Sequence, residues 1–279
     1  MVKRTKFSAF GLRIKGRHGS VEGSFPAGFS VTELLVTVSI IALMTSILVP
    51  ALDKAKANAK EVKCKSQLLE LGRIWKFYAE DNDGQFPERG CGYSYGAVSW
   101  FHCIRDYYWP NLELILCPMA TKTGREGGRN PYMAWENTTD FGAYYEGSYG
   151  VNLWVANGAD PDCGAAGPDF NVNCWQTPYA KGGAYAPLLL CSQWKDIQPY
   201  PTDEPPEHEN DMWTPNAQEV RRACIKRHNP YHVQVLFLDF SVDKRTIKEL
   251  WRLKWHKNWP ADYPLPIWPD WMADVPDPD

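Results

Sequence analysis

The longest apolar run of the chain lies near its beginning. No charged residue occurs between Leu34 and Leu52, a stretch of 19 positions. As a helix this run would be ~28 Å long, close to the ~30 Å hydrocarbon core of a bilayer, whereas a cleaved secretory signal has an apolar core of only about 7–15 residues. The run therefore predicts a membrane-spanning helix, and an ordinary cleaved signal peptide is the weaker interpretation.

Helical periodicity continues beyond this run. Apolar residues recur at three- and four-residue spacing as far as Tyr78, and basic residues fall between them. Pro50 removes one backbone hydrogen bond but does not end the pattern, so we expect a kink there. The sequence predicts one kinked helix from about Phe29 to Glu80, with its first half in the membrane and its second half against a globular domain. The Asp- and Gly-containing stretch 81–84 should end it in a turn.

The remainder of the chain is less regular. Residues 91–211 are rich in Gly, Pro, Tyr, Trp and Asn, which favours short strands and long loops, and "LELILCP" (112–118) is interpreted as a strand. Alternation in "HVQVLFLDFSVDKRTI" (232–247) predicts a hairpin with its turn at 239–241, followed by a short helix in "TIKELWRLKWHKNW". The six prolines of residues 260–279 predict an extended tail. We therefore expect an α+β protein: a long N-terminal helix packed on a small antiparallel sheet, with a loop-rich, cysteine-containing C-terminal region.

The charge distribution predicts the orientation of this helix in the membrane. The first 28 residues carry a net charge of +5 from Lys3, Arg4, Lys6, Arg13, Lys15 and Arg17 against Glu22. A basic flank stays on the cytoplasmic side, so the chain after the span should lie outside. The whole chain carries −3, and the part after the basic segment is therefore acidic. An acidic domain argues against a nucleic-acid partner, since phosphate binding requires a basic face.

Glu33 is a carboxylate at the edge of the apolar run. A lone carboxylate at bilayer depth costs about 2.5–3.5 kcal/mol on insertion scales, so an intramembrane acid is a functional hypothesis by default. The alternative is that Glu33 lies in the headgroup region and pairs with nothing.

The beginning of the chain resembles the type IV pilins and the pseudopilins of type II secretion. Members have a basic leader ending in Gly, then Phe, then an apolar helix with Glu at its fifth residue, and here these are Gly28, Phe29 and Glu33. The leader is longer than many in the family, and "SVTE" stands where "TLIE" is common. The Asp/Asn/Gly turn and the aromatic-Pro pair of "YAEDNDGQFP" (78–87) extend the resemblance.

The resemblance implies a processed filament subunit. A prepilin peptidase would cut after Gly28 and methylate the new amine of Phe29, and Glu33 would be the counter-charge of that amine in its own or a neighbouring chain. The implied partners are copies of the chain or other pilins, inner-membrane assembly machinery and membrane lipid. The mature chain would cross the inner membrane once, with its globular domain in the periplasm or at the cell surface.

This organisation divides the chain into five parts. They are a leader (1–28), a transmembrane and assembly helix (29–52), the outer helix half and turn (53–84), a pilin-like globular domain (85–259) and a proline-rich tail (260–279).

A second resemblance concerns the predicted hairpin. "RHNPYHVQVLFLDFSV" resembles the His-then-"FLDG" signature of large pilin-like proteins of planctomycete and lentisphaera bacteria. Here His228 precedes Asp239 by eleven positions, one more than usual, and Phe240 replaces the Gly.

Eight cysteines lie beyond the predicted span, on the side where disulfides are permitted: Cys64, Cys91, Cys103, Cys117, Cys163, Cys174, Cys191 and Cys224. Sequence alone does not pair them, but we expect Cys64 on the outer helix half to join Cys117 at the end of the expected strand. Their bridge would close a loop of about fifty residues, worth roughly 4 kcal/mol in the entropy model. No two cysteines are closer than 11 positions, which disfavours a structural zinc site, so neither a metal nor another cofactor is predicted.

Other candidate chemistry is sparse. Cys103 beside His102 is better explained by packing than by nucleophilic catalysis, so we do not expect an enzyme. Thirteen tryptophans, all after the span, favour an aromatic core, because Trp is highly buried on average. They leave one alternative open: a membrane-anchored glycan-binding protein with a pilin-like start. An exposed tryptophan stack would favour that alternative.

Overall fold

The computed structural model describes residues 28–88, 99–122, 131–138, 144–158, 170–209, 219–228 and 231–278. The chain is an α+β protein with one long N-terminal helix and small, mainly antiparallel sheets. It divides into two compact units, residues 1–51 and 52–279, and each is described by itself. The predicted leader, apart from Gly28, lies outside the described residues.

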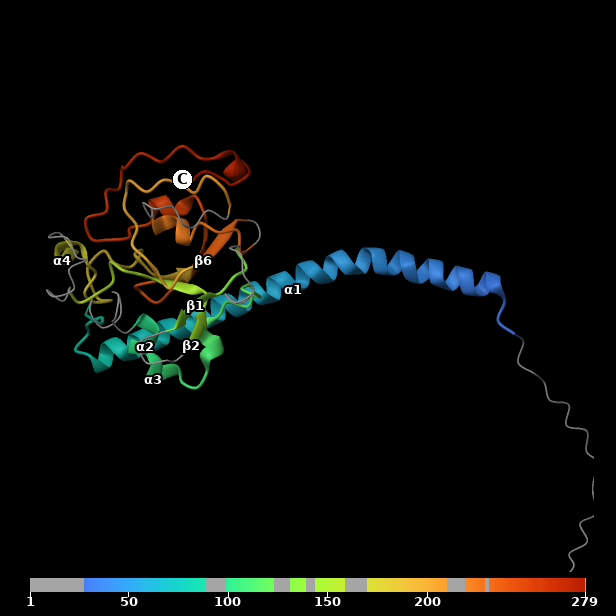
Figure 1. Ribbon diagram of the computed structural model, residues 1–279, viewed down its shortest axis with the longest axis horizontal. Helices are drawn as coiled ribbons and strands as arrows, with labels where there is room; N and C mark the ends of the chain where they lie inside the picture. The colour runs from blue at the N-terminus through green and yellow to red at the C-terminus, as the bar shows by residue number, and fades with distance from the viewer. Residues whose placement is uncertain are drawn as a thin grey trace, which may run out of the picture. The chain divides into compact units, whose positions relative to one another are not determined.

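Helix α1 extends from Val31 to Asp81 and is continuous through Pro50 (Figure 1). The predicted helix is thus confirmed to within two residues at each end. Every residue from 28 to 56 is exposed, although most of residues 34–52 are apolar. Among the described residues, α1 is the one helix that is long and apolar enough to cross a membrane.

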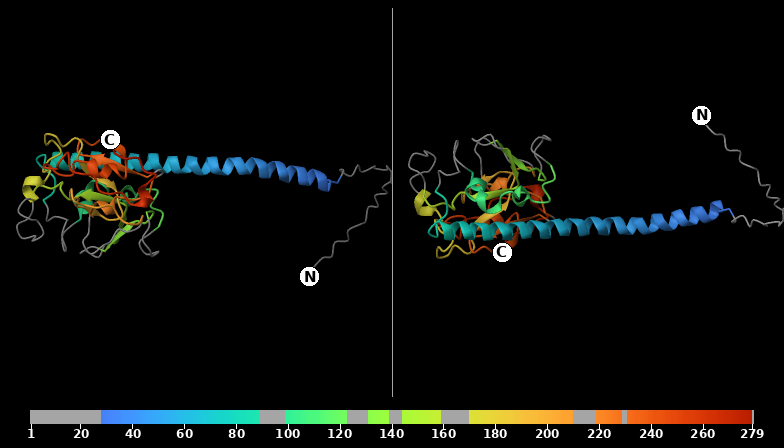
Figure 2. Two further views of the ribbon diagram at one scale, coloured as in Figure 1. Left: turned by 90° about the horizontal axis from the view of Figure 1, so that it is seen from above. Right: turned by 90° about the horizontal axis from the view of Figure 1, so that it is seen from below.

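The second half of α1 belongs to the larger unit and buries one face. Leu68, Leu71 and Trp75 on this face are fully buried. A Cβ added to Gly72 would lie 2.9 Å from Leu236 Cδ1, so a glycine lets this turn of the helix approach the sheet closely. In both views of Figure 2 most of the larger unit lies on one side of this helical segment, and the chain end marked C lies on the other.

The helix ends in the predicted turn. Asp83 has φ 53° and Gly84 has φ 74°, both in the left-handed region. The N–H of Gly84 donates to the carbonyl of Ala79 at 2.7 Å, which closes the helix end.

The main sheet has five strands in the order β5-β3-β4-β6-β7. Their bounds are β3 Tyr149–Asn152, β4 Pro187–Cys191, β5 Asp196–Ile197, β6 His232–Phe237 and β7 Val242–Thr246. All neighbouring pairs are antiparallel except β3 and β5, which are parallel. Strands β6 and β7 form the predicted hairpin and pair from His232–Thr246 to Leu236–Val242, which confirms the alternation in this segment.

A second sheet consists of β1 (Trp135–Thr138) and β2 (Tyr144–Gly147). Trp135 is the direct partner of Gly147, and a Cβ on that glycine would overlap the indole at 2.2 Å. The indole Nε1 donates to the carbonyl of Tyr149 at 3.0 Å, which ties this small sheet to the main one.

The other helices in the described part of the chain are single turns. They are α2 Trp100–Cys103, α3 Arg105–Tyr108, η1 Leu112–Ile115, α4 Phe170–Asn173, η4 Glu219–Arg222, η5 Glu249–Arg252 and η6 Asp270–Met272. Two predictions were wrong here. The segment before Cys117 is the 3₁₀ turn η1 rather than a strand, because its four residues are too short an apolar run for periodicity to decide. The helix expected after the hairpin is only the turn η5.

The proline-rich segment after residue 259 packs on the larger unit. Met272 and Val275 are buried in the core, and Lys248 Nζ lies 2.8 Å from the carboxylate of Asp277. The segment has little regular structure, as its prolines predict, but its side chains anchor it.

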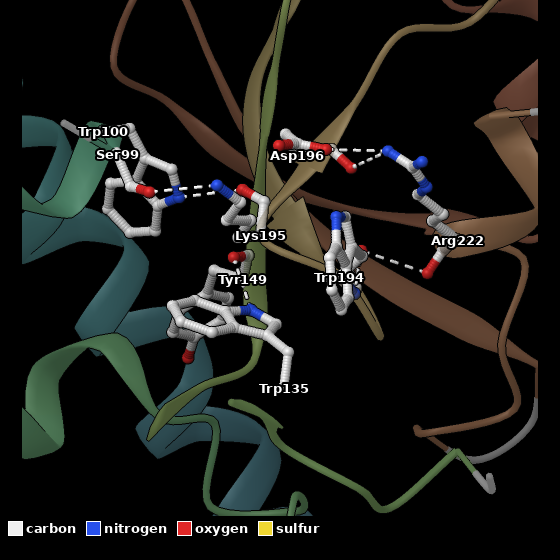
Figure 3. A network of polar contacts seen from close by, with 9 residues as sticks. Ser99, Trp100, Trp135, Tyr149, Trp194, Lys195, Asp196 and Arg222 are labelled. Carbon is white, nitrogen blue, oxygen red and sulfur yellow. Dashed lines mark hydrogen bonds and ion pairs between the residues drawn. The ribbon is translucent and has the colours of Figure 1, made fainter. Parts of the chain in front are cut away.

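Aromatic side chains and polar contacts fill the space around the sheet edge. Figure 3 shows Trp100 Nε1 donating to the carbonyl of Lys195 at 2.8 Å, and Asp196 paired with Arg222 at 2.7 Å. These contacts hold the β4–β5 connection against α2 and η4. The indole N–H of Trp100 thereby finds a partner even though the ring is buried.

Candidate metal centre

Four potential metal ligands meet in the interior of the larger unit: Cys64, Cys117, Cys191 and His228. Their ligand atoms all lie within 4.8 Å of one another. The Cys64 and Cys191 sulfurs are 3.6 Å apart, and His228 Nε2 lies 3.3 Å from the Cys191 sulfur and 3.6 Å from the Cys117 sulfur. The three cysteines are fully buried and His228 is 2 % exposed, so the cluster has no access to solvent.

Each ligand comes from a different part of the fold. Cys64 is on the buried face of α1, and Cys191 is the last residue of β4. Cys117 follows η1, and His228 precedes β6, forming an isolated bridge with His232. The cluster therefore lies where the helix, the sheet and two loops converge.

Strand pairing places a phenol beside the cluster. Tyr149 of β3 is the direct partner of Cys191 in β4, so both side chains lie on the same face of the sheet. The Tyr149 hydroxyl is 3.3 Å from the Cys64 sulfur and 3.2 Å from the side-chain oxygen of Gln67. Gln67 in turn donates to the carbonyl of Glu113 at 2.8 Å, which links α1 to η1.

Backbone contacts fix the two loop ligands. The N–H of Cys117 donates to the hydroxyl of Ser148. The guanidinium of Arg227, next to His228, donates to the carbonyls of Ser148, Pro131 and Met133 at 2.7, 2.6 and 2.9 Å. Ser148 thus connects the segments that carry Cys117 and His228.

Arg227 is a buried cation with an unusual set of partners. It is 1 % exposed, and within the described ranges its guanidinium contacts carbonyl oxygens and no carboxylate. A buried charge is costly without an opposite charge nearby. The interior around Arg227 therefore favours a group of net negative charge.

The pKa values of Cys64 and Cys191 shift in opposite directions. Burial raises the pKa of the Cys64 thiol well above its usual value. Burial acts in the same direction on Cys191, but contacts with Cys117 and Cys64 and the charge of His228 outweigh it and lower the pKa of Cys191. Burial lowers the pKa of His228, but Cys191 and Cys117 reverse this effect and raise it to about 10. The shifts of Cys191 and His228 thus have one cause, the mutual attraction of a thiolate and an imidazolium at close range.

The structure brings Cys64 and Cys117 together, as the sequence analysis expected, but as free thiols and in the company of two further ligands. Cys103, Cys174 and Cys224 are also free thiols, and Cys91 and Cys163 lie outside the described residues. Zinc was disfavoured from the sequence because no two cysteines lie close together along the chain. Tertiary structure instead brings together possible ligands from distant positions. The segment "RHNPYH" was the available signal, because it places His228 four positions before the buried strand β6.

The other predicted site residues are at the start of α1. Gly28 has no atom within 4 Å of an added Cβ, and Phe29 is 69 % exposed. Ser30 N–H and the Ser30 hydroxyl both donate to the Glu33 carboxylate at 2.8 Å, and Glu33 N–H donates back to the Ser30 hydroxyl at 3.2 Å. These contacts form a capping box, a local role for Glu33 that sequence reasoning missed although "SVTE" fits its pattern.

A surface hollow of the larger unit offers little for a ligand. It has a volume of about 410 Å³ and is lined by residues 201–207 and 263–269. Its buried acid, Asp203, already accepts the backbone N–H groups of Tyr200 and Val220 at 3.2 and 3.1 Å. A glycan-binding stack would need exposed tryptophans. Among Trp100, Trp109, Trp135, Trp154 and Trp175, only Trp109 is exposed and the other four are buried. The core interpretation is confirmed for those four.

Comparison with known proteins adds no assignment: the sequence matches no family model, and no curated protein or solved structure is significantly similar to it.

Proposed function

We propose that the chain is a subunit of a type IV pilus-like or type II secretion-like filament, processed after Gly28 and held in the membrane by the first half of α1 before assembly. The resemblance of residues 1–52 to pilins and pseudopilins is the origin of this proposal.

One observation supports it most. The helical segment from Val31 to Leu52 exposes its apolar side chains on every side, and no described residue of the first unit covers them. A contiguous apolar surface of this size requires lipid or other apolar helices around it. A filament of pilin-like subunits offers both in turn: lipid before assembly, and helices of neighbouring copies afterwards. Identical head-to-tail contacts that do not close give a filament.

Glu33 would have two roles, helix capping and charge pairing, which mutations can distinguish. Its carboxylate caps the helix through Ser30, and after processing it would also face the amine of Phe29 in its own or a neighbouring chain. Capping requires only a hydrogen-bond acceptor, which Gln supplies nearly as well as Glu. Pairing with an amine requires the negative charge.

The test compares Glu33→Gln with Glu33→Ala and Ser30→Ala. Sheared filaments and total membrane protein are measured for each variant and for the wild type. If the charge sets subunit register, Glu33→Gln removes filaments as fully as Glu33→Ala does, because an unpaired buried charge costs ~3–5 kcal/mol. Ser30→Ala removes the hydroxyl contacts of the cap but keeps the charge, so filaments should persist at reduced yield.

Normal filaments from Glu33→Gln would refute the charge pairing and leave capping as the function of Glu33. If the wild type forms no filaments while remaining in the membrane, the subunit proposal fails in favour of a single anchored protein. The glycan-binding alternative gains no support from the described residues, since the tryptophans named for it are mostly buried.

A further inference from the structure

We propose that Cys64, Cys117, Cys191 and His228 bind one zinc ion in a closed tetrahedral site that fastens α1 to the sheet. This inference is independent of the proposed function, because such a site would stabilise the larger unit whether or not the chain assembles.

The spacing of the ligand atoms fits a tetrahedral ion. Zinc bonds of ~2.3 Å to sulfur and ~2.0–2.1 Å to nitrogen place tetrahedral ligands ~3.8 Å apart for two sulfurs and ~3.6 Å apart for sulfur and nitrogen. The cluster has 3.6 Å between the Cys64 and Cys191 sulfurs, and 3.6 and 3.3 Å from His228 Nε2 to the sulfurs of Cys117 and Cys191. A disulfide would need two sulfurs at ~2.05 Å and would leave a third thiol and an imidazole buried beside it.

The chemical type of the four ligands indicates which class of metal they would bind. Three thiolates and one imidazole are soft and borderline donors, which suit zinc and exclude calcium or magnesium, whose ligands are oxygens. All four residues are buried, so no fifth position is open to water. A closed set of four such ligands is the arrangement of structural zinc sites rather than catalytic ones.

The charge of the occupied site suits its surroundings. Zn²⁺ with three thiolates and a neutral imidazole carries −1, and binding to the metal-free cluster releases three protons to solvent. Arg227, adjacent to His228 and joined to the Cys117 segment through Ser148, is a buried cation that contacts only carbonyls within the described ranges. The zinc centre would supply the opposite charge that this guanidinium lacks.

One neighbour of the ligands, Tyr149, also suits a thiolate centre. The Tyr149 hydroxyl lies 3.3 Å from the Cys64 sulfur and can donate to it. Nδ1 of His228 has no hydrogen-bond partner among the described residues, so this second ring nitrogen is not oriented in the way most zinc-bound histidines are.

The test measures zinc in the full-length chain, purified in detergent without added metal, by elemental mass spectrometry. We expect one zinc per chain in the wild type, and loss of that zinc in Cys191→Ser and His228→Ala. Cys224→Ser is the matched control: Cys224 is a buried free thiol outside the cluster, so its variant should keep one zinc per chain.

A second measurement on the wild type alone guards against variants that fail to fold. Urea unfolding in the presence of a chromophoric zinc chelator should release one equivalent of zinc per chain, at the same urea concentration at which the tryptophan fluorescence changes. Refolding with Co²⁺ should give the intense visible bands of tetrahedral thiolate coordination.

Three outcomes would overturn the proposal. They are a folded wild type with less than a tenth of an equivalent of zinc, one equivalent of iron in place of zinc, and a disulfide between two of the cluster cysteines in peptide maps made without reduction. The last outcome would support the Cys64–Cys117 bridge expected from the sequence if those two residues are the ones joined.

Discussion

The hydroxyl of Tyr149 lies 3.3 Å from the sulfur of Cys64, so a strand of the sheet contacts the long helix through a phenol and a thiol. If the thiol is a zinc-bound thiolate, this hydroxyl orients it and stabilises its charge. Partners of metal ligands typically contribute 10–100-fold in metal affinity. Tyr149→Phe should therefore weaken zinc binding by about that factor while leaving one zinc per chain at saturation, as measured by competition with a chelator of known affinity.

Tyr108→Phe is the matched control for this prediction. Tyr108 is also buried, and its hydroxyl donates to the carbonyl of Phe101 at 2.7 Å, away from the cluster. Its variant should lose stability without losing zinc affinity. Equal zinc affinity in the wild type and Tyr149→Phe would show that the phenol only packs against the helix.

The mature chain should begin at Phe29. Gly28 is exposed and an added Cβ would meet no atom within 4 Å, so its replacement by Leu should not disturb the fold. In the family that the sequence resembles, the peptidase requires this glycine, so Gly28→Leu should accumulate as an unprocessed precursor in the membrane. Mass spectrometry of the amino terminus decides the matter. An intact leader in the wild type, or a cut beyond the apolar run near Ala57, would contradict the prediction.

Gly147→Ala should destabilise the larger unit by about 1–3 kcal/mol, the usual cost of overpacking a core. The added methyl would overlap the indole of Trp135, which is held in place by its hydrogen bond to the carbonyl of Tyr149. Urea unfolding measures the change in free energy.

Trp135→Phe supplies the control for this clash. In that background the smaller ring leaves room for the methyl, and the cost of Gly147→Ala should fall by at least about half in a double-mutant cycle. An unchanged cost would mean that the glycine is required for its backbone rather than for the close approach of the indole.

His256 should make the larger unit less stable in mild acid. Burial, and to a smaller extent the charge of Lys254, lowers the pKa of His256 to about 4. Below pH 6.5, the ordinary pKa of the imidazole, the unfolded chain therefore binds a proton that the folded chain does not. The contribution of His256 to stability is full above this pH and is lost as the pH falls from 6.5 towards 4. Between pH 8 and pH 5 the loss from this one group is about 2 kcal/mol.

His256→Phe tests this assignment. The imidazole lies between the rings of Trp154 and Trp259, and its Nδ1 has no partner within the described part of the chain, so an aromatic ring without a charge can replace it. The variant should lose less stability than the wild type between pH 8 and pH 5 in parallel urea titrations. Identical losses in the two proteins would exclude His256 as the source.

Sequence reasoning recovered the features that depend on local pattern. The long helix, its terminal turn at Asp83 and Gly84, and the β6–β7 hairpin follow from periodicity and turn chemistry within short windows. It failed where an apolar run was too short to distinguish a strand from a helical turn, as before Cys117. It also overlooked the Ser30–Glu33 capping box, whose pattern was present, because the resemblance implied the amine of Phe29 as the partner of Glu33.

The candidate metal centre could not be predicted for a different reason. Its ligands are separated by 53 to 164 positions from Cys64, and no spacing rule applies when each ligand belongs to its own structural element. Tertiary structure determines that Tyr149 pairs with Cys191. It also determines how the helix face that carries Cys64 packs. Only the sheet order β3-β4-β6 brings these residues and His228 to one place.

The order of the four ligands along the chain has a consequence for biogenesis. Cys64 is synthesised first and His228 last, after more than half of the chain has followed. A complete ligand set exists only once the segment leading into β6 has arrived, so an early-emerging helix would carry a reactive thiol with no coordination partner. During this interval Cys64 would be open to oxidation, and a chain truncated before residue 228 could not close the site.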